Sequence, residues 1–192
     1  MKLNYKRTIF VGFAFFLICS FWQAYDNTIP LILTNKFGMS QAWSGVIMAL
    51  DNVLALFMLP LFGAISDKHR GKRGRRTPFI LLGSGIATLS VPLIAIANNA
   101  GSLPLLICAI LITLLAICMY RTMTVAIVAD ITPRPLRTKA DSVQKIVGYA
   151  GTGVMLVAIS VMVPNVERPD YLPLFLLQAA FVLVSAVVYG LL

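Results

Sequence analysis

The sequence predicts an all-α membrane protein with six transmembrane helices. Hydrophobic residues make up 59% of the 192 residues and charged residues only 12%, whereas a soluble domain carries about 25% charged residues. The mean hydropathy is +0.87, and the charges stand in short runs between long apolar stretches. Too few polar side chains remain to cover a water-soluble surface, so we expect residues 1–192 to form a single transmembrane bundle.

Six apolar stretches match the roughly 20 residues that a helix needs to cross the hydrocarbon core. The first follows three basic residues, as a signal peptide would, but it is too long for one and no cleavage site follows. The charge-free stretch 77–120 is too long for one helix and breaks at Asn98–Ser102. In the fifth stretch, the glycines within Gly148–Gly153 predict close helix packing. The predicted spans are about 8–33, 41–66, 78–97, 103–129, 141–163 and 172–192.

Basic residues predict how these spans are oriented. The amino terminus and the two loops on its side carry twelve Lys and Arg, whereas the opposite loops carry two. Because Lys and Arg accumulate in cytoplasmic loops, we expect a multi-pass protein of the cell membrane with both termini in the cytoplasm. This placement also accounts for the net charge of +9 without a nucleic-acid partner.

The residues that most cofactor sites and enzymes require are sparse. The three cysteines lie in apolar runs without a CxxC spacing, and the single histidine, His69, lies in a basic loop. No nucleophile–base pair, glycine-rich phosphate loop or metal-ligand spacing is visible. We expect no cofactor, no metal and no enzymatic activity.

Four charged residues fall inside the predicted spans: Asp26, Asp51, Arg121 and Lys145. An ionised side chain at the bilayer centre costs about 2.5–3.5 kcal/mol and therefore usually faces a cavity. We expect the first, second, fourth and fifth spans to line a cavity, with the third and sixth facing lipid. The rise of about 1.5 Å per residue places both acids in the outer half and both bases in the inner half. Alternatively, the acids pair with the bases and hold the bundle together.

Aromatic and amide side chains accompany these charges. Carboxylates and amides form hydrogen bonds with pairs of hydroxyl groups, and aromatic faces stack on sugar rings, so the set suits a polyhydroxylated ligand. A carboxylate in a low-dielectric cavity can also exchange a proton, for which Asp51 is the first candidate; Asp26, Arg121 and Lys145 are the other candidates for proton or cation coupling. The candidate ligand-binding residues are Trp22, Tyr25, Asp26, Asn52, Tyr120, Arg121 and Tyr149.

The basic loop between the second and third spans has an ordered pattern. Gly63 stands four residues before Asp67, and Gly74, Arg75 and Arg76 open the next helix. This pattern resembles the cytoplasmic signature of the major facilitator superfamily, G-x-x-x-D followed by G-R-R. The spacing and the ending Arg-Arg-x-Pro-Phe-Ile resemble the sucrose-transporter and glycoside–pentoside–hexuronide:cation symporter branch.

Three further stretches carry the same resemblance: Trp22–Asn27, Asp51–Asn52, and Ala129–Pro133 with the basic residues that follow. The resemblance implies a six-helix half, built of two inverted three-helix repeats, of a twelve-helix fold. It also implies a cytoplasmic gating motif in which Asp67, Arg75 or Arg76, and Asp130 stabilise the outward-open state.

The resemblance implies secondary transport of a sugar, coupled to a cation, by alternating access. A proton is favoured over sodium because the sequence shows no dedicated multi-oxygen cation site. Because only six spans are present, we expect a fragment that needs either the missing carboxy-terminal half or a second copy of itself. Two alternatives stay open at this point. One is an ion-driven exporter of drugs or metabolites, and the other is a membrane assembly subunit that transports nothing.

Overall fold

The computed structural model describes residues 5–69, 76–163 and 169–191. In these residues it has six long α-helices and no strand, so the all-helical prediction is confirmed. A π-helical turn, η1 (Ile32–Lys36), continues the first helix, and a 3-10 turn, η2 (Arg134–Leu136), precedes the fifth. Each predicted span falls on one helix. The helices are α1 (Tyr5–Leu31), α2 (Gln41–Lys68), α3 (Thr77–Ala100), α4 (Leu103–Ile131), α5 (Arg137–Met162) and α6 (Leu172–Leu191).

Four apolar segments of the described chain are long enough to cross a membrane: Gln41–Lys68, Thr77–Ala100, Leu103–Ile127 and Arg134–Met162. The described apolar part of α6, Leu172–Val187, is shorter. The chain is therefore a multi-pass membrane protein, and the number of six crossings stays a prediction.

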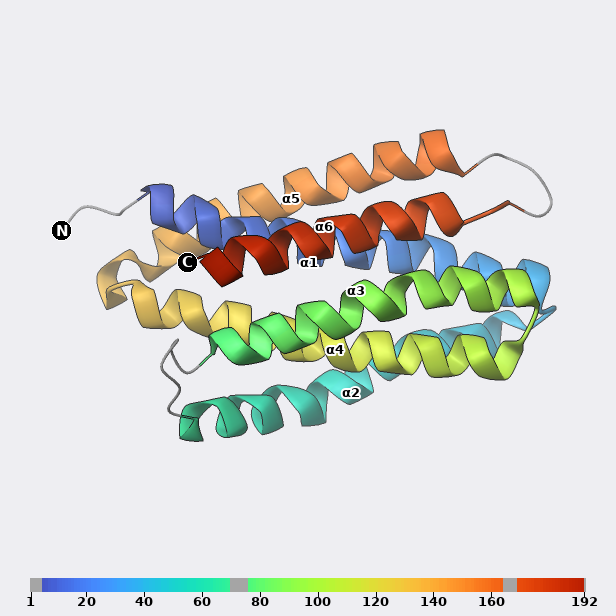
Figure 1. Ribbon diagram of the computed structural model, residues 1–192, viewed down its shortest axis with the longest axis horizontal. Helices are drawn as coiled ribbons and strands as arrows, with labels where there is room; N and C mark the ends of the chain where they lie inside the picture. The colour runs from blue at the N-terminus through green and yellow to red at the C-terminus, as the bar shows by residue number, and fades with distance from the viewer. Residues whose placement is uncertain (1–4, 70–75, 164–168, 192) are drawn as a thin grey trace.

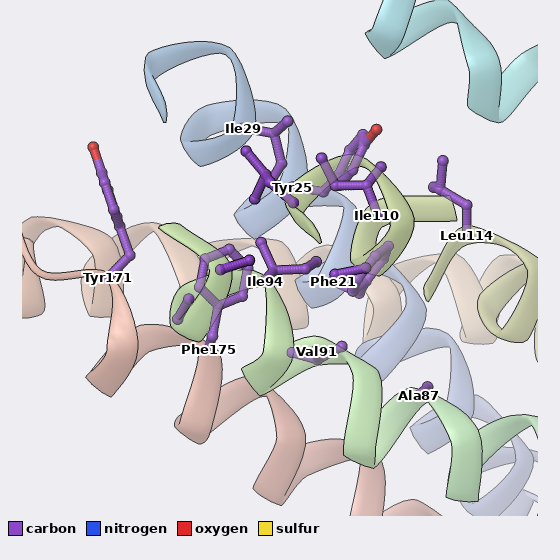
Figure 2. Packing of buried hydrophobic residues seen from close by; sticks show 14 of the residues in the cluster. Phe21, Tyr25, Ile29, Ala87, Val91, Ile94, Ile110, Leu114, Tyr171 and Phe175 are labelled. Atoms are coloured by element: carbon purple, nitrogen blue, oxygen red, sulfur yellow. The ribbon is translucent and has the colours of Figure 1, made fainter. Parts of the chain in front are cut away.

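Helix α1 lies at the centre of the bundle. It packs along α5 and also contacts α6, α4 and α2 (Figure 1). Helix α3 packs against both α4 and α6, whereas α2 packs chiefly on α4. The largest core cluster joins α1, α3, α4 and α6 through side chains such as Phe21, Ile94, Ile110 and Phe175 (Figure 2).

Glycines bring α1 and α5 close together, as predicted. A Cβ atom on Gly151 would collide with the carbonyl oxygen of Phe16, and one on Gly148 would lie 2.9 Å from Cys19 Sγ. A Cβ atom on Gly153 would meet no atom within 4 Å. The first two glycines therefore permit the helix contact, and the third does not take part in it.

The two ends of the bundle differ in character. Helix α1 begins, α2 ends, α3 begins and α6 ends at the same end, together with the α4–α5 connection (Figure 1). The described basic residues there are Lys68, Arg76, Arg134, Arg137 and Lys139. We call this the basic end. The far end consists of η1, the turn at Gly101 that ends α3 with φ +66°, and residues 169–171.

The α1–α5 contact predicts that two glycine-to-alanine replacements on α5 have different effects on stability. Gly151→Ala should lower the free energy of unfolding by about 1–3 kcal/mol, since the added methyl group forces the backbones apart. The matched control Gly153→Ala should leave stability unchanged or raise it by up to about 1 kcal/mol, because alanine favours helix. Thermal unfolding in detergent measures both, and equal stability of the two variants would contradict the close contact.

Candidate functional site

Helix α1 leaves only one stripe of its surface open near its middle. Neighbours such as Phe21 and Ala24 are at most 1% exposed, whereas Asp26 and Asn27 are exposed and Trp22 and Gln23 are half-buried. Residues three and four apart share a helix face, so these four form one patch. This polar stripe is the natural position for a ligand on an otherwise buried helix.

Asp51 of α2 approaches the polar stripe. It is half-buried, and its carboxylate oxygen Oδ1 accepts hydrogen bonds from the backbone N–H (2.6 Å) and side-chain Nδ2 (2.9 Å) of Asn52. The carboxylate lies within electrostatic range of Asp26 and of the Tyr25 hydroxyl. The acids from α1 and α2 are therefore close enough to influence each other electrostatically, and no basic side chain of the described chain forms an ion pair with either.

Two aromatic side chains beside these acids carry donors without partners. The rings of Trp22 and Tyr25 meet edge to face with centroids 5.8 Å apart. Tyr25 Oη and Trp22 Nε1 are both buried, and neither has a hydrogen-bond partner among the described residues. Figure 2 shows the Tyr25 hydroxyl pointing out of the core cluster. Since buried polar groups are nearly always hydrogen-bonded, these two donors are available to a ligand.

Arg121 borders the polar stripe without pairing to the acids. Its exposed side chain on α4 lies within electrostatic range of Cys19 on α1 and of Cys118. Asp51 also lies within range of Cys118. Because no ion pair joins Arg121 to Asp26 or Asp51 in the described chain, the alternative that such pairs hold the bundle together is wrong for this conformation.

Lys145 differs from the prediction. Its Nζ atom lies 2.9 Å from Asp141 Oδ2, one turn earlier on α5, and both side chains are more than half exposed. Its charge is therefore paired on its own helix and not with Asp26 or Asp51. Tyr149, one turn further along α5, is 71% exposed and follows Gly148, which contacts Cys19 of α1.

Tyr120 is a second correction. It is only 2% exposed, and its hydroxyl forms a 2.6 Å hydrogen bond with Ser185 Oγ of α6. It therefore belongs to the core, and the prediction that it contacts a ligand is wrong. Successive residues on a helix point about 100° apart, which is why Arg121 reaches the surface and Tyr120 does not. Gln23 and Asn27 also lie on the polar stripe and were missed, although Gln23 is three residues from Asp26 and four from Asn27, a spacing that indicates one face.

A second group of charges lies at the basic end. Arg76, at the start of α3, donates from Nε to Asp130 Oδ2 (2.7 Å) and from Nη2 to Asp67 Oδ1 (3.3 Å). The guanidinium thereby joins the end of α2, the start of α3 and the end of α4. Of the two arginines considered for this position, Arg76 makes the contacts, while Arg75 and Gly74 lie outside the described residues. A Cβ atom on Gly63 would meet nothing within 4 Å among the described residues, so no contact with that part of the chain requires glycine there.

Comparison with known proteins identifies a family and individual proteins that are similar to this chain in sequence. The sequence profile of the family described as Major Facilitator Superfamily matches residues 11–192. A segment of 66 residues is 38% identical to sucrose transport protein SUC4 of Arabidopsis thaliana, and one of 74 residues is 38% identical to sucrose transport protein SUC3 of the same plant. These segments cover 34% and 38% of the chain, but only 13% and 12% of the relatives.

Two solved structures resemble the fold. A crystal structure of a bacterial homologue of the iron transporter ferroportin, in the inward-facing state, superposes with a TM-score of 0.76 and 14% identity. A bacterial metal transporter superposes with a TM-score of 0.69 and 15% identity. Both superpositions cover 95% of this chain but only 44% and 48% of the neighbour, so the chain spans less than half of either protein. At such identities the likeness shows the fold alone.

The basic-end cluster makes a testable contribution to stability. Arg76→Gln should lower the free energy of unfolding by about 1 kcal/mol, because it removes a partly buried guanidinium shared by two carboxylates. Lys139→Gln removes one positive charge from the same end of the bundle and should change stability by much less. Thermal unfolding in low salt compares the two variants, and an equal effect of both would refute the role of Arg76 as the link between three helices.

Proposed function

The chain belongs to the Major Facilitator Superfamily, and from this membership we propose that it forms one six-helix half of a proton-coupled sugar transporter. The proposal is supported by the segments similar to sucrose transport proteins and by the polar stripe of α1 beside Asp51. In this proposal a small sugar binds between the two halves, and transport proceeds by alternating access.

The observation that carries the proposal is the combination of two carboxylates and two unpartnered donors in one place. The carboxylates of Asp26 and Asp51 accept hydrogen bonds from sugar hydroxyl groups. The Tyr25 O–H and the Trp22 N–H donate to sugar oxygen atoms. Each hydroxyl group of a sugar is both donor and acceptor, so one polyhydroxylated ligand satisfies all four groups. Asn52 beside Asp51 adds an amide to this set.

Coupling to a cation is proposed for the acid pair. Two carboxylates within electrostatic range of each other in a membrane protein attract a positive charge, and intramembrane acids commonly relay protons. We assign the proton to Asp51, because it lies on α2 opposite the ligand-contacting stripe. Arg121 is the proposed group that approaches the acids when the proton leaves. Lys145, already paired with Asp141, is omitted from this role.

The gating role is proposed for the basic-end cluster. Arg76 holds the ends of α2 and α4 against α3 through Asp67 and Asp130. These contacts favour the conformation in which the cytoplasmic ends are packed together, the outward-open state. Separation of the ends then requires that at least one carboxylate leave the guanidinium.

A partner half is proposed to cover the polar stripe. Helix α2 exposes large apolar side chains, among them Leu56 (70%) and Phe57 (62%), and α5 exposes Val161 (78%). Lipid covers apolar side chains of this kind, but it would leave Asp26 without solvation. We therefore propose that a second six-helix half, or a second copy of this chain, faces the stripe, with Tyr149 of α5 at its border.

The coupling proposal is tested by replacing one carboxylate. In vesicles from cells that express the complete protein, Asp51→Asn should reduce proton-driven accumulation of sucrose or a related oligosaccharide by tenfold or more, because the proton site is lost. Sugar exchange without a proton gradient should continue. The control Asp141→Asn removes a carboxylate outside the polar stripe and should transport normally; undiminished accumulation by Asp51→Asn would end the assignment.

Two tyrosines provide a matched test of ligand contact. Tyr25→Phe should weaken sugar binding by about tenfold, equivalent to about 1.4 kcal/mol, and should not lower stability, because the hydroxyl has no partner among the described residues. Tyr120→Phe should leave binding unchanged and lower stability by about 1 kcal/mol, because it removes the bond to Ser185. Calorimetric titration with thermal unfolding measures both, and the reverse pattern would exclude Tyr25 from the site.

A further inference from the structure

A pocket lies at the far end of the bundle, away from the polar stripe. Its walls come from three separate segments: the end of α1 with η1, the last turn of α3, and residues 169–171 before α6. Its volume is about 110 Å³, which admits a small head group and not an oligosaccharide. The polar side chains that line it are Asn35, Lys36, Asn98, Asn99 and Asp170.

Two opposite charges line this pocket without pairing to each other. Lys36 Nζ donates to the backbone carbonyl oxygen of Asn98 in the last turn of α3. Asp170 Oδ1 accepts from the backbone N–H of Leu172 (3.0 Å) and from Asn99 Nδ2 (3.3 Å). No ion pair joins the lysine to the aspartate within the described chain: the lysine is bonded to Asn98, and the aspartate to Asn99 and Leu172.

Each charged group keeps hydrogen-bonding capacity for a ligand. A lysine ammonium has three donors, and one of those on Lys36 is used. The hydrogen bonds that Asp170 accepts from the described residues all go to Oδ1, which leaves Oδ2 as an acceptor. A third polar group supports this view. Asn98 lines the pocket and is 2% exposed, and its Oδ1 atom has no hydrogen-bond partner in the described part of the molecule. The pocket therefore offers an anion site at Lys36 and an acceptor pair at Asp170 and Asn98.

We propose that this pocket binds the head group of a zwitterionic phospholipid with a primary ammonium, its phosphate at Lys36 and its ammonium at Asp170 and Asn98. The pocket lies at the end of α3, a helix long enough to cross a membrane, and head groups are found at the ends of such helices. Exposed apolar side chains occur at the same end of α1, α3 and α6, namely Leu31 (47%), Ile96 (51%) and Leu176 (49%). They provide surface for the acyl chains, which a free solute would not use.

The first measurement uses the unaltered chain. Native mass spectrometry of the purified full chain in detergent compares phosphatidylethanolamine, phosphatidylcholine and phosphatidylglycerol. We expect the first lipid to bind at least tenfold more tightly than the other two, because phosphatidylcholine has no N–H donor and phosphatidylglycerol has no ammonium. Absence of this preference overturns the proposal whatever the variants do.

The second measurement locates the site. Lys36→Gln keeps a donor for the Asn98 carbonyl oxygen, and Asp170→Asn keeps an acceptor for the start of α6, so both remove charge with little change of fold. Each should lower phosphatidylethanolamine affinity about tenfold, while Lys139→Gln and Asp141→Asn should not. Equal losses in all four variants overturn the assignment to this pocket.

Free phosphoethanolamine separates a lipid from a soluble ligand. It carries the same phosphate and ammonium without acyl chains, so we expect it to compete only at concentrations at least a hundredfold above those of the lipid. Competition at equal concentrations overturns the proposal in favour of a solute site. None of these results depends on sugar transport, because the pocket shares no residue with the polar stripe or with Asp51.

Discussion

The need to keep ionised and polar groups out of hydrocarbon governs this structure. Helix α1 contacts four other helices and can therefore bury apolar side chains around most of its circumference. Its acid and amides lie on the one stripe that no helix covers. Asp51 approaches the same region from α2. Helix α2 packs chiefly on α4 and has few contacts with α1, so Asp51 stays half-buried. The place where a ligand can bind is thus the place where the bundle has not filled its own surface.

The close contact of α1 and α5 makes this arrangement possible. Gly148 and Gly151 let the backbone of α5 approach Phe15, Phe16 and Cys19, so two long helices meet without bulky side chains between them. In a membrane, small residues at such contacts allow the van der Waals packing that holds helices together. The contact also fixes the rotation of α1, and thereby the direction in which Asp26 faces. Packing on one side of α1 determines the chemistry on the other.

Sequence reasoning predicted the helices well, because the length of an apolar stretch directly reflects the thickness of the bilayer. Sequence reasoning was less successful in predicting which face of a helix a residue occupies. Helix α4 is mostly apolar, so its pattern did not show that Tyr120 faces the core, although adjacent residues such as Tyr120 and Arg121 point about 100° apart. The Asp141–Lys145 contact follows the spacing of four residues that favours ion pairs on a helix, and it was visible in advance. The far-end pocket could not be predicted from the sequence, because its walls come from three segments that are distant in the chain and meet only in the tertiary structure.

The contacts of Arg76 could not be predicted for the same reason. Consecutive arginines are equivalent in a sequence pattern, and only the structure shows that Arg76 bonds to both Asp67 and Asp130. The basic-end cluster differs from the two acids at the polar stripe. At the basic end opposite charges pair within the chain, whereas Asp26 and Asp51 form no ion pair among the described residues and, in our proposal, are compensated by another molecule.

The attachment of α3 at both of its ends has a mechanical consequence. At one end Arg76 connects it to α2 and α4, and at the other Lys36 connects its terminal carbonyl to the extension of α1. A helix held at both ends resists sliding along its axis. A movement at one end of α3 is therefore transmitted to the other end. Tilting of the whole bundle as a lever therefore requires less rearrangement than sliding of its individual helices.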